Sequence, residues 1–178
     1  MAVLSIIETP DPRLRQISQP VEQVDDALRA LMDDMVETMY AASGIGLAAI
    51  QVGVPKRVLV IDLQDDDENG ERVRKPLYFV NPEIVSESDD LSVFNEGCLS
   101  VPEMYADVSR PASVRARWLD YDGVLHEEDL DEMMATCLQH EMDHLNGVLF
   151  IDHLSKLKRD MLLKKLEKNR KAVKSEAA

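Results

Sequence analysis

The feature that most constrains the fold of this chain is the motif His140-Glu141-Met142-Asp143-His144. It lies within residues 131–146, a stretch that begins with acidic residues and stops before a glycine, as an α-helix does. Residues four apart lie one above the other on a helix, so both imidazoles can bind one ion while Glu141 lies beside them. Two histidines alone bind a divalent ion weakly, so the fold has to bring a third ligand to this helix.

Four residues are candidates for that third ligand: Cys98, Cys137, His126 and His153. Cys137 precedes His140 by three residues and would face the same way, although a helical cysteine is more often a core residue. Gly97 permits a sharp bend that would present a Cys98 thiolate to the helix from outside. The two histidines have no supporting pattern and are interpreted as surface residues. Spacing slightly favours Cys98 without deciding the matter.

Hydrophobic periodicity predicts helices on either side of a β-rich middle. One apolar stripe covers residues 25–42, and Ser155 can cap a further helix whose lysines lie off its apolar face. Strands are predicted at 58–63, 77–85, 114–121 and 124–130, the last two as a hairpin around an Asp-Gly turn.

These elements predict an α+β fold: antiparallel β-sheets around a central metal-binding helix, with an N-terminal helix and a C-terminal helix. The length of 178 residues predicts one domain, 1–178, in which residues 155–174 form the C-terminal basic helix.

The charge of −14 is unevenly distributed along the chain. From Lys156 onward nine basic and three acidic residues leave a charge of +6, so the preceding part carries −20. Such an acidic body argues against DNA or general nucleic-acid binding, whereas the basic tail suits an anionic partner. No apolar stretch approaches ~20 residues and no export signal is visible, so we expect no membrane association, a cytoplasmic location and reduced cysteines.

Three separated motifs, in the same order, resemble those of the peptide deformylase family. They are Gly44-Ile45-Gly46-Leu47-Ala48-Ala49-Ile50-Gln51, Glu96-Gly97-Cys98-Leu99-Ser100 and the His140-to-His144 motif. The resemblance covers nearly the whole chain. The helical, lysine-rich ending resembles the bacterial subtype of Gram-negative type.

The resemblance implies a metal-dependent hydrolase that removes the formyl group from the N-terminal formylmethionine of newly made proteins. It implies that Cys98, His140 and His144 hold one divalent ion, usually iron(II), with zinc, nickel or cobalt able to replace it. Glu141 would be the general acid and base. Gln51 and the Leu99 backbone N–H would bind the developing oxyanion.

The substrate contacts are expected along the first motif and on the metal-binding helix. Ile45 and Gly46 would run beside the peptide backbone, while Cys137, with Met133, would line an apolar pocket for the methionine side chain. The resemblance also pairs Glu96 with Arg110 near the Cys98 loop, and it implies ribosome contact through the basic helix. Several bacterial members have arginine where this chain has Tyr105, which puts a charge-based contact with the downstream peptide in doubt.

Two alternative functions remain. A metallopeptidase with the same helix motif is one, although the longer protease motif would need a histidine where Phe150 stands. The other is an inactive metal-binding relative that associates with ribosomes. Glu141 and Gln51 argue against inactivity, because neither is needed simply to hold an ion.

Overall fold

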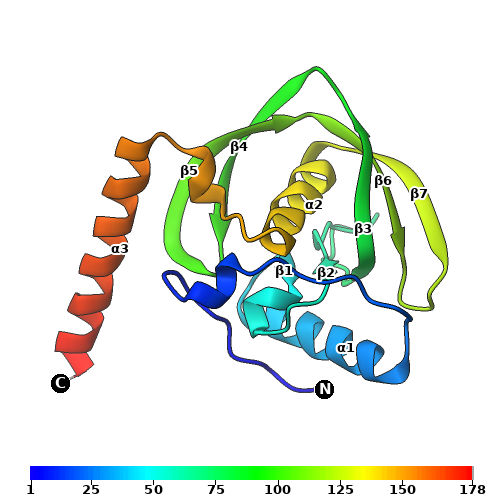
Figure 1. The fold of residues 1–178 in the computed structure, drawn as a ribbon, viewed down its shortest axis with the longest axis horizontal. Coiled ribbons are helices and arrows are strands. Elements are labelled where there is room, and N and C mark those ends of the chain that lie inside the picture. The colour runs from blue at the N-terminus through cyan, green and yellow to red at the C-terminus, as the bar shows by residue number, and fades with distance from the viewer. Residues whose placement is uncertain (178) are drawn as a thin grey trace.

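Helix α2 (Glu132–Leu145) lies in the middle of the molecule, with strands on either side of it (Figure 1). In this computed structural model, which describes residues 1–177, the strands form an antiparallel five-stranded sheet of order β1-β2-β3-β6-β7 and a separate hairpin, β4-β5. Their bounds are β1 (Gly46–Ala48), β2 (Val58–Ile61), β3 (Leu77–Glu87), β4 (Leu91–Cys98), β5 (Val101–Pro111), β6 (Ser113–Leu119) and β7 (Leu125–Asp131). The predicted α+β fold is confirmed.

The five-stranded sheet is covered by α2 on one face and by α1 (Asp26–Ala41) on the other. On β2, Leu59 and Ile61 pack into the core cluster that contains α2, whereas Val58 and Val60 pack into the cluster that contains α1. This alternation follows from the two-residue period of a strand. Because both faces of β2 are buried, its sequence is a continuous run of apolar residues. The sheet supports α2 through these contacts.

The predicted hairpin near the end of the sheet is confirmed. Strands β6 and β7 pair in register from Ser113 opposite Asp131 to Leu119 opposite Leu125. Gly123 adopts a φ of 79° in the connecting turn, a backbone conformation that glycine adopts without steric cost. The helix predicted at 25–42 and the strands predicted at 58–63 and 77–85 correspond to α1, β2 and β3.

The β4-β5 hairpin was not predicted as a pair of strands. Gly97 is paired with Tyr105, the pairing becomes irregular between Gly97 and Cys98, and the chain then turns at Leu99 and Ser100. A Cβ atom on residue 97 would lie 2.4 Å from Cε1 of Tyr105, so any larger residue there would displace the aromatic ring that covers the glycine. The irregularity after Gly97 and the turn that follows it place Cys98 at the end of β4.

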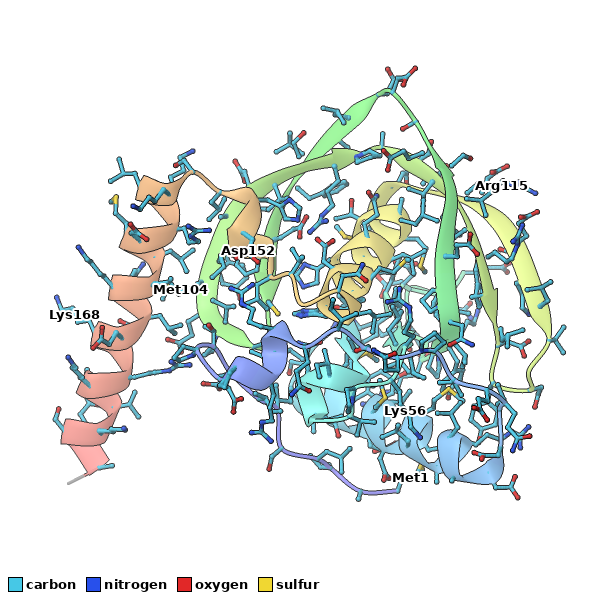
Figure 2. The ribbon with its side chains drawn as sticks, viewed as in Figure 1. Met1, Lys56, Met104, Arg115, Asp152 and Lys168 are labelled. Atoms are coloured by element: carbon cyan, nitrogen blue, oxygen red, sulfur yellow. The ribbon has the colours of Figure 1, made fainter. Side chains whose placement is uncertain are left out.

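Helix α3 (Lys156–Ala177) runs along the outer edge of the molecule, beside β5 (Figure 1). Among its described residues only Leu166 is buried, in a cluster with Val101, Met104 and Val108 of β5. Lys168 projects away from the body of the protein (Figure 2). Three short 3-10 helices complete the fold: η1 (Pro12–Arg15), η2 (Ala49–Val52) and η3 (Phe150–His153).

None of the helices within residues 1–177 combines the length and the apolar character needed to cross a membrane.

Candidate metal centre

Three potential metal ligands converge on the inner face of α2. His140 and His144 stand one helical turn apart, and Cys98 reaches them from the end of β4. The Sγ atom of Cys98 lies 3.3 Å from Nε2 of His144, and the ligand atoms of all three residues lie within 4.8 Å of one another. Within residues 1–177 this is the only group of three or more such side chains that could hold a metal ion.

The other candidates for the third ligand lie outside this cluster. His126 interacts with Asp120 at 2.7 Å on the sheet, and His153 interacts with Asp143 at 2.8 Å near the surface. Cys137 is not part of the cluster, and its buried side chain packs in the hydrophobic core around α2. The geometry therefore selects Cys98.

Glu141 lies beside the cluster and is 5% exposed. Its Oε2 atom has no hydrogen-bond partner among the described residues, which is unusual for a buried polar atom. Burial raises the pKa of Glu141 to about 7, and the charge of His140 opposes this shift. A cation nearby would lower that value further. A buried carboxylate next to a cation is therefore subject to two opposing shifts of its pKa, and such a group can accept a proton and return it.

The side-chain amide of Gln51 is held in one orientation next to Cys98. Its Oε1 atom accepts a hydrogen bond from the Ala48 backbone N–H at 2.9 Å, which turns Nε2 the other way. That nitrogen donates to Ser100 Oγ at 3.0 Å and lies 3.6 Å from Cys98 Sγ. Leu99 stands in the turn between β4 and β5, and its N–H donates to no other backbone group within residues 1–177. Two donors therefore border the cluster.

A buried ion pair links the two elements that supply the ligands. Glu96 of β4 accepts hydrogen bonds from Arg110 Nε and Nη2 at 2.8 and 3.0 Å, and it interacts with Nδ1 of His140 at 2.8 Å. Arg110 also donates to Asp143 at 2.9 Å. Although burial alone would raise it, hydrogen bonds from His140 and Arg110 lower the pKa of Glu96. The ionised Glu96 fixes the His140 ring so that Nε2 faces the cluster.

The cluster opens into a cavity of about 410 Å³. Cys98, His140, Glu141 and Gln51 border its polar end. Its apolar walls include Ile45, Phe94, Met133 and Cys137. Gly46 also borders this cavity, and a Cβ atom on residue 46 would lie 2.5 Å from Oε1 of Glu141. The glycine therefore makes room for the carboxylate.

Comparison with known proteins identifies the family. The family model for polypeptide deformylase matches residues 3–160. The chain belongs to the polypeptide deformylase family. A peptide deformylase of Rhizorhabdus wittichii is 66% identical over 176 residues, which span 98% of this chain and 99% of that relative. A peptide deformylase of Novosphingobium aromaticivorans is 63% identical over an alignment of 187 positions, gaps included, which covers 97% of this chain and all of that relative.

Solved peptide deformylase structures share the fold. The enzyme of Ehrlichia chaffeensis in complex with actinonin is 46% identical, with a TM-score of 0.87 over 95% of this chain and 98% of that one. The enzyme of Legionella pneumophila is also 46% identical, with a TM-score of 0.87 over 96% of this chain and 97% of that one. The predicted family is confirmed, and this deformylase family member is a hydrolase.

Peptide deformylases use a single divalent metal ion, and the residues of this member fit one. A thiol and two imidazoles with their ligand atoms in one small group suit a borderline transition-metal ion. The unpartnered Oε2 of Glu141 lies next to this group without belonging to it, so the carboxylate remains free for chemistry.

All nine residues predicted for the site lie in or around this one region of the deformylase fold. Sequence reasoning missed two polar neighbours, Ser100 and Thr136. Ser100 accepts the hydrogen bond that orients Gln51, and it stands inside the second motif, where it could have been noticed. Thr136 lines the cavity four residues before His140, so helical spacing alone places it on the same face.

Proposed function

We propose that this chain removes the formyl group from the N-terminal formylmethionine of newly made proteins and releases formate. The observation that carries the proposal is a buried Glu141 carboxylate with an unpartnered oxygen, next to a Cys-His-His cluster at the end of a cavity. A metallopeptidase would use a similar helix motif, but the family match favours deformylation.

We propose that Cys98, His140 and His144 hold one divalent ion, with iron(II) as the ion in the cell. Zinc, nickel and cobalt suit the same thiolate and imidazole donors and could replace it. When bound, the ion would act as a Lewis acid and lower the pKa of a water molecule towards roughly 7. Glu96 supports the site by keeping His140 in the orientation seen in the structure.

The protein's own groups carry the remaining steps. Glu141 accepts a proton from the attacking water, whose oxygen forms a bond to the formyl carbon. Gln51 Nε2 and the Leu99 N–H donate hydrogen bonds to the formyl oxygen as it becomes negative, and each such donor typically contributes ~3 kcal/mol. Glu141 then gives its proton to the methionine nitrogen as the carbon–nitrogen bond breaks. The products are formate and a free amino terminus.

The substrate backbone has a suitable partner in β1. This strand is at the end of the five-stranded sheet and pairs only with β2, so its other edge can bind an extended peptide next to Ile45 and Gly46. The methionine side chain would then enter the apolar part of the cavity, between Met133 and Cys137. Formyl is the smallest acyl group, so limited space beside the metal ligands would favour it sterically.

The test compares two peptides with the protein purified anaerobically and its metal identified by elemental analysis. Formyl-Met-Ala-Ser should release formate, and Met-Ala-Ser should remain intact. Cleavage of Met-Ala-Ser without formate release from the formylated peptide would establish a metallopeptidase instead. No turnover of either peptide by the metal-loaded protein would indicate an inactive relative.

We further propose that α3 contacts ribosomal RNA near the exit of nascent chains, which places the protein in the cytoplasm. Six lysines of α3 are exposed and form no ion pair with another described residue: Lys156, Lys158, Lys164, Lys165, Lys168 and Lys174. These cations stand on an element that projects from an otherwise acidic body, where they can meet phosphates without competing carboxylates.

Charge reversal tests this contact. The triple substitution Lys164→Glu, Lys165→Glu and Lys168→Glu should weaken ribosome co-sedimentation strongly and leave turnover of formyl-Met-Ala-Ser unchanged. Lys56→Glu is the matched control, because Lys56 is an exposed lysine on the body of the protein, away from α3 (Figure 2). Equal ribosome binding by the triple variant and the control would refute the contact.

A further inference from the structure

Thr136 is a buried polar residue in the wall of the active-site cavity. It belongs to α2, lines the cavity and is 4% exposed. Its hydroxyl oxygen is covered by protein in the rotamer of this structure and has no hydrogen-bond partner within residues 1–177. The cavity wall combines polar residues with apolar ones, among them Ile45, Phe94 and Met133. Thr136 therefore lies in the cavity into which the proposed function places the side chain of methionine.

This arrangement carries an energetic cost that packing does not explain. A threonine in a helix ordinarily directs its hydroxyl to a backbone carbonyl of the preceding turn or to water. A buried hydroxyl without a partner is destabilising, whereas valine would fill the same space without that cost. Such a group is better explained by a partner that arrives with the substrate.

Thr136 also lies close to the proposed metal ligand His140. It precedes His140 by four residues, which is about one helical turn or ~5.4 Å along the axis of α2. A methionine side chain that starts next to the metal cluster and runs along α2 therefore passes Thr136. Rotation about χ1 exchanges the hydroxyl with the methyl group, and threonine in helices populates two such rotamers.

We propose that Thr136 is a specificity-determining residue whose hydroxyl donates a hydrogen bond to the thioether sulfur of the substrate methionine. This inference rests on the function proposed above. Sulfur is the one heteroatom of that side chain and a weak acceptor. The hydroxyl thus lets the pocket distinguish methionine from an aliphatic side chain of the same shape, which apolar walls alone do poorly.

The test combines one change in the substrate with one change in the protein, and each change nearly preserves shape. Norleucine replaces the sulfur of the substrate by a methylene group, and Thr136→Val replaces the hydroxyl by a methyl group. The value of kcat/KM is measured for formyl-Met-Ala-Ser and formyl-norleucyl-Ala-Ser with each protein. We expect the wild-type preference for methionine to fall about three- to tenfold in Thr136→Val, which is the range of one ordinary hydrogen bond. Thr136→Ser, which keeps the hydroxyl, should retain the preference.

The outcome separates this inference from the function on which it rests. If Thr136→Val is active and shows the wild-type ratio between the two peptides, the hydroxyl does not contact sulfur and the proposal is wrong. Loss of the preference in Thr136→Ser to the same extent as in Thr136→Val would also refute it, because packing would then be the cause. Failure of the wild-type protein to release formate would instead refute the proposed function.

Discussion

Helices α2 and α3 differ in how many of their residues are buried. Ten of the 14 residues of α2 are buried, whereas Leu166 alone is buried among the 22 of α3. Some polar side chains of α2 contact named partners, as His140 does Glu96 and Asp143 does Arg110, whereas Thr136 Oγ1 and Glu141 Oε2 have none among the described residues. Most lysines of α3 face solvent. Catalysis and stability therefore depend on α2, while α3 can change with little effect on either.

The largest effect is expected from Glu141→Gln on α2. This substitution keeps the shape of the side chain and removes its ability to accept and return a proton, a role that contributes about 10²–10⁴-fold. We expect turnover of formyl-Met-Ala-Ser to fall by about 10³-fold with the metal content unchanged by elemental analysis. Activity close to that of the wild type would remove Glu141 from the mechanism.

The second-largest effect is expected from breaking the Glu96–Arg110 ion pair next to the metal cluster. Arg110→Met leaves Glu96 buried without its cationic partner, since both side chains are 5% exposed. Loss of one partner of such a pair costs about 3–5 kcal/mol of unfolding free energy. Metal affinity should also fall, by about 10–100-fold, because Glu96 holds His140.

Arg115→Met is the matched control for this experiment. Arg115 forms ion pairs on the exposed surface of the sheet, where a pair contributes about 0–1 kcal/mol. Urea unfolding of the two metal-loaded variants measures the difference. Equal stabilities would show that the buried pair does not organise the site.

A smaller difference is expected from truncating one leucine on each helix. Leu138 of α2 is fully buried, so Leu138→Ala should cost about 2–5 kcal/mol of unfolding free energy. Leu157 of α3 is 71% exposed, and Leu157→Ala should stay within about 0.5 kcal/mol. Thermal unfolding measures both. A substantial loss for Leu157→Ala would mean that its side chain is covered, as by a second protein molecule.

The smallest effect is expected when the chain is ended before Lys164. This deletion removes Leu166 from its contact with β5 but keeps Leu162 and Leu163, which also pack there. Turnover of short formylated peptides should remain within about twofold of the full chain. A large loss of kcat would show that α3 supports the metal centre across η3, and the two helices would then be less independent than the burial indicates.

Local sequence patterns predicted the elements whose geometry depends on neighbours in the chain. The apolar stripe of α1, the helical motif of α2 and the Asp122-Gly123 turn are all of this kind. The β4-β5 hairpin was missed because its strands mix acidic, small and apolar residues, and its pairing depends on the tight turn at Leu99 and Ser100. Neither strand shows a sustained alternation of apolar and polar residues, which is the pattern that reveals a half-buried strand.

The same limit applies to the site. The spacing of His140 and His144 follows from one helix, whereas the choice of Cys98 over Cys137 needed either the family resemblance or the coordinates. The sequence indicated a bend near Gly97, where the strand pairing is irregular, but it did not reveal that the Tyr105 ring covers this glycine. Thr136 was overlooked because a lone threonine carries no pattern. Its interest comes only from a buried oxygen that has no hydrogen-bond partner among the described residues.

The close approach of Gly46 to Glu141 has a consequence for how this protein can vary. Residue 46 has no side chain, and the carboxylate of Glu141 lies close to the place that a Cβ atom there would occupy. Even alanine there would push the proton acceptor aside. In a saturation mutagenesis screen, residue 46 should therefore be among the positions that tolerate the fewest substitutions.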